Sequence, residues 1–281
     1  MTYMDIDQLK TLLRQNNLRP NFTYGQNFLI DDFILEDIVD ASEVTKEDSV
    51  LEIGPGIGNL TQKLIERAKF VLSIEKDPKF FPILKALKKD HQENFRFEIA
   101  DALEYNFQKF FLDQGDKNYK VVANIPYYIT GKILQMLMTA KHKPTTVTIL
   151  TQKEVAKNLQ AEAGDLSILA ISVQLHGQPK IVKIVPARSF YPAPKVDSAI
   201  VNIKLFNKPK YKITNTKHFF RILKACFSGK RKQIHNTLMN NLHLDKNTAL
   251  GVLKELKISP TARPQELTIE QWVKLSELIN E

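Results

Sequence analysis

The segment "NIPYY", residues 124–128, places a carboxamide, a proline and two tyrosines directly after the apolar run "KVVA". Polar groups at the carboxyl ends of parallel strands usually face the ligand crevice of an open α/β sheet. Asn-x-Pro is also a common turn signal, and tyrosines after a turn often cover the edge of a core. The segment is therefore a candidate ligand loop, with a plain turn as the alternative.

A glycine-rich segment lies earlier in the chain, in "LEIGPGIGNLT", with Gly54, Gly56 and Gly58 at alternate positions. Glycine permits positive φ and lets a ligand approach the main chain closely. The Gly-x-Gly-x-Gly spacing differs from the Gly-x-Gly-x-x-Gly of dinucleotide sites. We predict a ligand-binding turn before a helix that opens near Asn59, with a tight strand-to-helix turn as the alternative.

Acidic residues follow the next two predicted strands. Glu75 ends "VLSIE" about 20 residues after the glycines, where a carboxylate commonly accepts the hydroxyls of a ribose. Asp101, in "IADAL", could accept a hydrogen bond from an adenine amine. With Asn124 after the fourth strand, the order predicts a nucleoside ligand and resembles class I S-adenosylmethionine-dependent methyltransferases.

The elements that would position these residues alternate short β-branched runs with helical patterns from about residue 49, which is typical of βαβ units. We predict an α/β, Rossmann-like mixed sheet of seven strands, the last two pairing antiparallel at one edge. The pattern is purely helical after about residue 206. We therefore expect a catalytic domain over residues 1–206 and a smaller, all-helical, basic RNA-binding domain over 207–281. The predicted strands are "SVLEI", "FVLSIE", "FRFEI", "KVVAN", "TVTILTQ", "KIVKIV" and "SAIVNIK".

The Asn-Ile-Pro-Tyr loop suits an adenine amine, whose lone pair is delocalised into the ring. The side-chain carbonyl of Asn124 and the backbone carbonyl of Ile125 could accept its two N–H bonds, while Pro126 stiffens the backbone. Tyr127 could stack on the base, and the loop resembles that of adenine amino-methyltransferases. A stacked base must be flipped out to reach such a site. Phe190, in "SFYPAPKVDSAI", is expected to form a second aromatic wall, or else to anchor an edge turn.

Charge is concentrated in one region of a chain whose net charge is +9. Residues 198–244 contain ten Lys and Arg and no Asp or Glu. Lys230, Arg231 and Lys232 are our candidate contacts to RNA phosphates, the alternative being a solvated helical face. The single cysteine and six scattered histidines predict no metal site. No membrane span or signal peptide is readable, so we expect a cytoplasmic protein.

Eight segments occur in the order found in the ribosomal RNA small-subunit adenine dimethyltransferase family: "YGQNFLID", "LEIGPGIGNLT", "IEKD", "DAL", "NIPYYIT", "QKEVA", "FYPAPKVDSAIV" and "RPQELTIEQWVKL". The resemblance implies dimethylation of two adjacent adenosines in the 3′-terminal hairpin loop of small-subunit (16S) rRNA, within an immature 30S-type subunit. It also implies S-adenosylmethionine as the donor. We expect the protein to be a monomer that uses no metal. Its donor contacts map to Asn27, Leu29, Gly54, Glu75, Asp101 and Asn124, and Gly56 belongs to the same glycine turn.

The chain departs from this family in "AEAGDLSILAISVQ", which is shorter than the usual loop, and in "SGKRKQIHNTL", which replaces an Arg-Arg-Lys-Thr-Leu pattern. Both departures bear on RNA docking. A large-subunit rRNA adenine methyltransferase of the antibiotic-resistance type shares the loop but is disfavoured by the C-terminal segment. A DNA adenine methyltransferase is also disfavoured, because such enzymes usually have a second proline in the loop and a separate target-recognition region, and the sequence shows neither. An assembly factor with dispensable catalysis is the remaining alternative.

Overall fold

The computed structural model describes residues 6–21, 25–116, 118–229 and 231–279. These divide into two compact units. The first comprises Met1–Ala156 and Gln178–Leu205, and the second Lys157–Gly177 and Phe206–Glu281.

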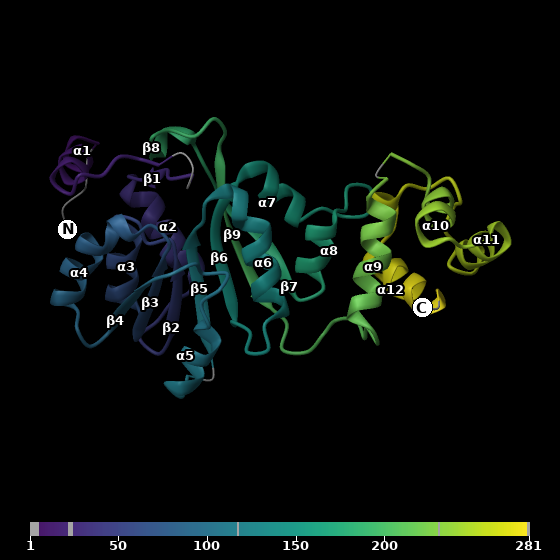
Figure 1. The fold of residues 1–281 in the computed structure, drawn as a ribbon, viewed down its shortest axis with the longest axis horizontal. Coiled ribbons are helices and arrows are strands. Elements are labelled where there is room, and N and C mark those ends of the chain that lie inside the picture. Colours follow the sequence, from purple (N-terminus) through teal and green to yellow (C-terminus); the bar gives the residue numbers. More distant parts are fainter. Residues whose placement is uncertain (1–5, 22–24, 117, 230, 280–281) are drawn as a thin grey trace. The chain divides into compact units, whose positions relative to one another are not determined.

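A seven-stranded mixed sheet forms the centre of the first unit (Figure 1). The strands β4, β3, β2, β5 and β6 are parallel, and β9 is antiparallel to β6. In sheet order the strands are β4 (Phe95–Ile99), β3 (Phe70–Glu75), β2 (Ser49–Ile53), β5 (Tyr119–Asn124), β6 (Thr146–Gln152), β9 (Ser198–Leu205) and β7 (Gly177–Val185). The predicted α/β fold and its seven strands are confirmed, including the place of the last two runs beside each other at one edge.

A second, two-stranded sheet is not predicted by the strand patterns. It pairs β1 (Phe28–Leu29) with β8 (Phe190–Tyr191) in antiparallel register. Strands of two residues carry no alternating pattern, so only the folded chain reveals them.

Helices cover both faces of the large sheet. Helices α2 and α3 pack together against β3, β5, β6 and β9, where Val50, Val71 and Val122 lie in one buried cluster. On the opposite face, Phe111 of α5 stacks on Tyr119 of β5 at 4.6 Å between ring centroids. The helices that lie wholly in this unit are α1 (Ile6–Gln15), α2 (Asp32–Ser42), α3 (Asn59–Arg67), α4 (Phe81–Asp90), α5 (Phe107–Asp113) and α6 (Thr130–Thr139). Helix α7 (Lys153–Leu159) spans the division at residue 157.

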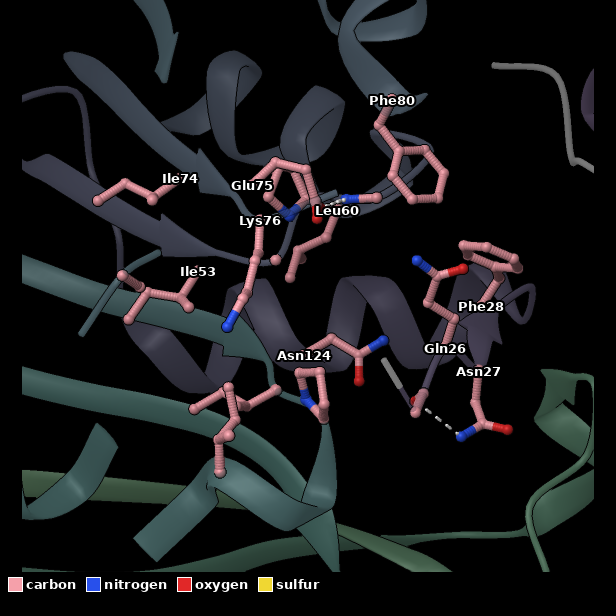
Figure 2. Close-up of a pocket in the computed structure, with 18 of the residues that line it drawn as sticks. Gln26, Asn27, Phe28, Ile53, Leu60, Ile74, Glu75, Lys76, Phe80 and Asn124 are labelled. Atoms are coloured by element: carbon pink, nitrogen blue, oxygen red, sulfur yellow. Dashed lines mark hydrogen bonds between the residues drawn. The ribbon is translucent and has the colours of Figure 1, made fainter. Parts of the chain in front are cut away.

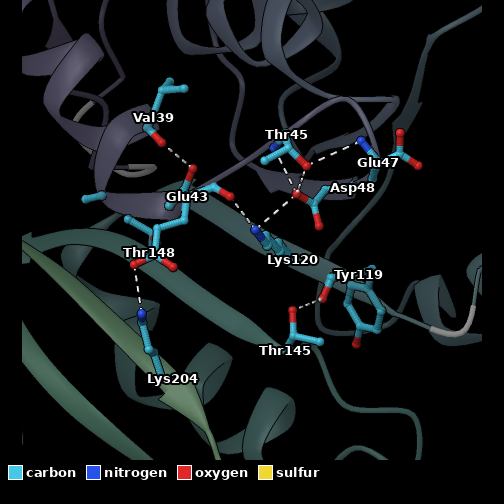
Figure 3. Close-up of polar contacts among 12 residues, drawn as sticks. Val39, Glu43, Thr45, Glu47, Asp48, Tyr119, Lys120, Thr145, Thr148 and Lys204 are labelled. Carbon is cyan, nitrogen blue, oxygen red and sulfur yellow. Dashed lines mark hydrogen bonds and ion pairs between the residues drawn. The ribbon is translucent and has the colours of Figure 1, made fainter.

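Ion pairs and hydrogen bonds tie the loop after α2 to the amino end of β5 (Figure 3). Lys120 pairs with Asp48 at 3.0 Å and also donates to the backbone carbonyl of Glu43. Lys204 of β9 pairs with the Glu43 carboxylate at 2.8 Å. These contacts lie at the amino ends of the parallel strands β5 and β6, the edge opposite to their carboxyl ends, and they secure the sheet rather than a site.

The second unit is helical. Its helices are α8 (Ile168–Gln174), α9 (Thr216–Phe227), α10 (Ile234–Leu242), α11 (Lys246–Glu255) and α12 (Ile269–Leu278). They enclose a hydrophobic cluster in which Leu166 and Ile171 are buried together with Phe219, Ile222 and Trp272.

The domain boundary expected at 206/207 therefore needs one correction. Residues 157–177 were expected in the catalytic domain, but they belong to the helical unit. Their apolar side chains complete the core of that unit, and the backbone N–H of Gly164 donates to the carbonyl of Gln265 at 2.9 Å. Among the described residues, no helix is long and apolar enough to cross a membrane.

Candidate active site

One pocket in the first unit lies at the carboxyl ends of β2, β3 and β5 (Figure 2). The register aligns Ile53 with both Ile74 and Ala123, so Gly54, Glu75 and Asn124 emerge at the same edge. The residues expected to contact the donor or the target all line this pocket, Phe190 excepted: Asn27, Leu29, Gly54, Gly56, Glu75, Asp101, Asn124, Ile125, Pro126 and Tyr127.

The glycine turn adopts the backbone conformation that its sequence requires. Gly54, Gly56 and Gly58 have φ values of 75°, 54° and 83°, which side-chain-bearing residues rarely adopt. A Cβ atom on Gly56 would lie 3.5 Å from the Phe28 ring, and one on Gly58 would lie 3.3 Å from a methyl carbon of Leu87. The turn thus presents bare backbone to the pocket and leads into α3 at Asn59.

Glu75 fastens this turn to the second strand. Its carboxylate accepts the backbone N–H of Gly56 at 3.0 Å and that of Asp77 at 2.8 Å. The side chain is 7% exposed, and burial raises the pKa of its carboxyl group. Because an ionised carboxylate offers about four lone-pair sites, it retains capacity to accept hydroxyl groups from a ligand.

Beneath the same turn lies a second buried carboxyl group, Glu52, to which the sequence pattern assigns no separate role. Its Oε2 accepts the hydroxyls of Thr61 at 2.7 Å and Ser73 at 2.6 Å, whereas its Oε1 is buried with no hydrogen-bond partner in the structure. Burial raises the pKa of Glu52 to about 7, with a smaller contribution from the charge of Glu75.

Folding stability should therefore depend on the protonation of Glu52. The Glu52 carboxyl group holds its proton more tightly in the folded state than in the unfolded chain. The protonated group therefore makes its full contribution to the free energy of unfolding below pH 4.5, and this contribution is lost as pH rises through about 7. At pH 8 the loss should reach about 3 kcal/mol. Glu52→Gln, which mimics the protonated form, should remove that loss. Denaturant unfolding at pH 5 and pH 8 measures it, and equal pH dependence in both proteins would contradict the assignment.

Asp101 follows the carboxyl end of β4 and lies beside Lys76, a residue to which the sequence analysis gives no role. Lys76 pairs with Asp101 at 2.7 Å, and this contact lowers the pKa of the Asp101 carboxyl group. The other carboxylate oxygen accepts the backbone N–H of Leu103 at 2.9 Å. Lys76 also lines the pocket, and its position directly after Glu75 in "IEKD" was the available signal.

Asn124 is the last residue of β5, and Figure 2 shows its carboxamide projecting from the strand end into the pocket. Pro126, at φ −54°, begins a short 3₁₀ turn in which its carbonyl accepts the N–H of Ile129 at 3.1 Å. The Tyr127 hydroxyl lies 2.7 Å from the Ser198 hydroxyl, and burial raises the pKa of this phenol. The loop is thus anchored at both ends and aimed into the pocket.

The segment containing Asn27 and Leu29 reaches the pocket through the two-stranded sheet. Phe28 pairs with Tyr191 and Leu29 with Phe190, and Asn59 donates its side-chain N–H to the Leu29 carbonyl at 3.2 Å. Asn27 donates to the carbonyl of Gly25 at 3.2 Å (Figure 2). Tyr24, the first residue of the matching motif, lies outside the described residues.

Phe190 is not placed as expected. Its side chain is 3% exposed and packs in the cluster containing Leu29, Ile34 and Leu35, and it does not line the pocket. Pairing in β8 turns this ring toward the core, so in this structure it anchors the sheet and forms no second aromatic wall. Other aromatic residues line the pocket instead, namely Phe28, Phe80, Tyr127 and Tyr128.

Helix α1 is a further contributor that sequence reasoning missed. Its buried residues Leu9 and Leu13 pack in one cluster with Phe28, Ile57 and Phe80, all three of which line the pocket. The amphipathic pattern of "IDQLKTLL" predicts a helix, but nothing in it tells which surface the helix covers.

The candidate phosphate contacts lie in the second unit. Arg231 and Lys232 are exposed just before α10, and Lys230 lies outside the described residues. Within the described parts of the chain, no group of three or more His, Cys, Asp or Glu residues could hold a metal ion.

Comparison with known proteins identifies relatives over nearly the full chain. Residues 17–281 match the family model described as ribosomal RNA adenine dimethylase. The chain is 39% identical over 272 residues to the ribosomal RNA small subunit methyltransferase A of Clostridium botulinum (strain Okra / Type B1), covering 96% of this chain and 98% of that protein. It is 38% identical over 268 residues to the protein of the same name from Dehalococcoides mccartyi (strain CBDB1), covering 95% and 91%.

Two crystal structures are also similar. A dimethyladenosine transferase from Plasmodium falciparum superimposes with a TM-score of 0.73 at 30% identity, covering 87% of this chain and 94% of that one. The 23S rRNA methyltransferase ErmE gives 0.69 at 28% identity, covering 90% and 99%.

Proposed function

Because the chain belongs to the ribosomal RNA adenine dimethylase family, we propose that its pocket binds S-adenosylmethionine and positions adenosines of small-subunit rRNA for methyl transfer. The chain is an rRNA adenine dimethyltransferase that acts on small-subunit rRNA. We further propose that the enzyme dimethylates two adjacent adenosines in the 3′-terminal hairpin loop of this rRNA. Its substrate is an immature 30S-type subunit in the cytoplasm. The enzyme acts as a monomer and uses no metal. One observation carries the proposal: the ten residues that the sequence predicts to contact the donor or the target line a single pocket.

The residues of the glycine turn fit this donor. Gly54 and Gly56 line the pocket at positive φ and present backbone without a side chain, and the buried Glu75 retains lone pairs for the ribose hydroxyls. Asp101 would accept a hydrogen bond from the adenine amine, while Asn27 and Leu29 would contact the donor from the segment at β1. When bound, the donor supplies a methyl group on a sulfonium, which is already a strong electrophile.

The protein's main task is then to fix the target amine. Asn124, through its side-chain carbonyl, and Ile125, through its backbone carbonyl, would each accept one N–H of the amine, which aims its lone pair. The turn that begins at Pro126 holds both acceptors still, and Tyr127 would stack on the base. Orientation and exclusion of water account for the rate in this scheme, without a covalent intermediate.

The substrate is tested by primer extension on rRNA from cells with and without the protein. Dimethylation removes both amine hydrogens and blocks Watson–Crick pairing, so the parent cells should give a stop at the small-subunit hairpin loop that deletion cells lack. A stop that depends on the protein but lies in large-subunit rRNA would favour the activity named for the similar ErmE structure. A deletion strain rescued by a protein without methyl transfer would favour an assembly factor with dispensable catalysis.

The exposed basic residues before α10 should contact RNA phosphates. Arg231→Gln with Lys232→Gln should flatten the logarithmic salt dependence of binding to unmethylated small subunits by about 1.5 units, since each neutralised phosphate contributes about 0.7 to 0.9. Donor affinity should not change. Lys230 belongs to the same hypothesis but lies outside the described residues.

A matched control changes two exposed lysines of the same unit, Lys254→Gln with Lys257→Gln. It removes the same amount of positive charge as the first double variant, but from a segment that also contains the acidic Glu255. If both double variants shift the slope equally, the effect is one of net charge. If neither shifts it, the residues before α10 are only a solvated surface.

A further inference from the structure

Tyr128 is a large aromatic side chain that remains exposed where the pocket opens. It is 59% exposed, and within the described part of the chain it is the one exposed large apolar side chain that also lines the pocket. It follows directly on Tyr127, which is partly buried and whose hydroxyl is hydrogen-bonded with that of Ser198. The two adjacent tyrosines therefore face different surroundings.

The Tyr128 ring is supported from one side. A Cβ atom built on Gly25 would lie 3.5 Å from one ring carbon of Tyr128 and 3.6 Å from the next, so the ring packs against the Gly25 backbone. Gly25 has φ +60°, a conformation that favours glycine and permits this close approach. The 3₁₀ turn Tyr127–Ile129 leads directly into α6, which fixes the backbone of Tyr128 and the direction of its Cα–Cβ bond.

The position of Tyr128 limits what could lie on its open side. The loop proposed to receive the target amine ends only one residue earlier, so a group that touches the open side of Tyr128 lies close in space to the target nucleotide. When one base is extruded into a pocket, its neighbours remain outside, and enzymes of this kind contact those flanking nucleotides. Unpaired RNA bases commonly stack on exposed aromatic rings.

We propose that Tyr128 is a positioning residue, a stacking platform for the nucleotide adjacent to the adenosine in the pocket. This inference rests on the proposed function of the pocket. Stacking uses the face of a base rather than its amine, so the platform accepts an adenosine before and after methylation. It therefore suits a substrate in which two neighbouring adenosines enter the pocket in turn.

The test is steady-state methylation of small subunits from cells that lack the enzyme. Tyr128→Ala should raise KM for the subunits about tenfold, as expected for the loss of one base–aromatic stack. The value of kcat and the dissociation constant for S-adenosylmethionine should stay close to those of the parent. Tyr128→Phe and Tyr128→Trp, which keep an aromatic face, should behave like the parent, whereas Tyr128→Leu should resemble Tyr128→Ala.

Phe81→Ala is the matched control, since Phe81 is an exposed aromatic residue of the same unit, 44% exposed, that does not line the pocket. An unchanged KM in Tyr128→Ala, an equal loss in Tyr128→Phe, or an equal loss of donor affinity would each overturn the platform. A parent enzyme that does not methylate small subunits would instead refute the proposed function, whatever the Tyr128 variants do.

Discussion

Asn124→Ala should reduce kcat by about 10²-fold or more while leaving donor affinity nearly unchanged. The substitution removes one of the two acceptors that would hold the target amine, and misplacement of a reacting group by about 1 Å costs a loss of that size. Ile125 would still offer its backbone carbonyl, so some orientation survives. Single-turnover methylation of small subunits, with calorimetric titration of S-adenosylmethionine, separates the two quantities.

The control for this variant is Asn247→Ala, which truncates an exposed asparagine of α11. It should match the parent in both measurements. Asn124 also lines the pocket beside Gly54, where a Cβ atom added to the glycine would lie 3.6 Å from the backbone carbonyl oxygen of Asn124. A fall in donor affinity as large as the fall in turnover would therefore make Asn124 chiefly a donor ligand and contradict the division of roles proposed above.

Glu75→Ala should weaken donor binding by about 1.5 to 3 kcal/mol, the usual range for hydrogen bonds to a charged group. The reason is twofold. Glu75 would bind the ribose hydroxyls, and it already holds the backbone N–H groups of Gly56 and Asp77. Loss of the carboxylate should loosen the glycine turn as well as remove the ligand contact. Calorimetry with S-adenosylmethionine measures the first effect, and amide hydrogen exchange at Gly56 reports the second.

Glu66→Ala provides the comparison, because Glu66 is an exposed carboxylate on α3 in the same unit. It should change neither measurement. Unchanged donor affinity in Glu75→Ala would show that the carboxylate serves only to fasten the turn.

The sequence pattern predicts the strand tips well because each lies at the end of a short, mainly apolar run. Gly54, Glu75 and Asn124 had to lie at one edge once their strands were parallel, and the register places them there. The positive φ values at the glycines follow from residue type alone. These features are local or follow from one topological rule, which is why the sequence suffices for them.

Features that depend on contacts between distant segments were not predictable in this way. Residues 157–177 read as part of the first domain because their apolar residues do not reveal which core they join. Phe190 looked like a site residue because its motif is aromatic and rich in proline, whereas pairing in β8 decides which way its ring faces. The contribution of α1 to the pocket has the same origin, since amphipathicity specifies a buried face but not its partner.

The two-stranded sheet of β1 and β8 also has a consequence for the order of events during synthesis. Its first strand leaves the ribosome early and its second leaves late, after six strands of the large sheet and every helix that lies wholly in the first unit. The segment containing Asn27 and Leu29 must wait for that partner, and closing so long a loop is slow compared with local pairing. A nascent chain would therefore acquire the glycine turn first, and the wall formed by Asn27 and Leu29 only when residues 190–191 emerge.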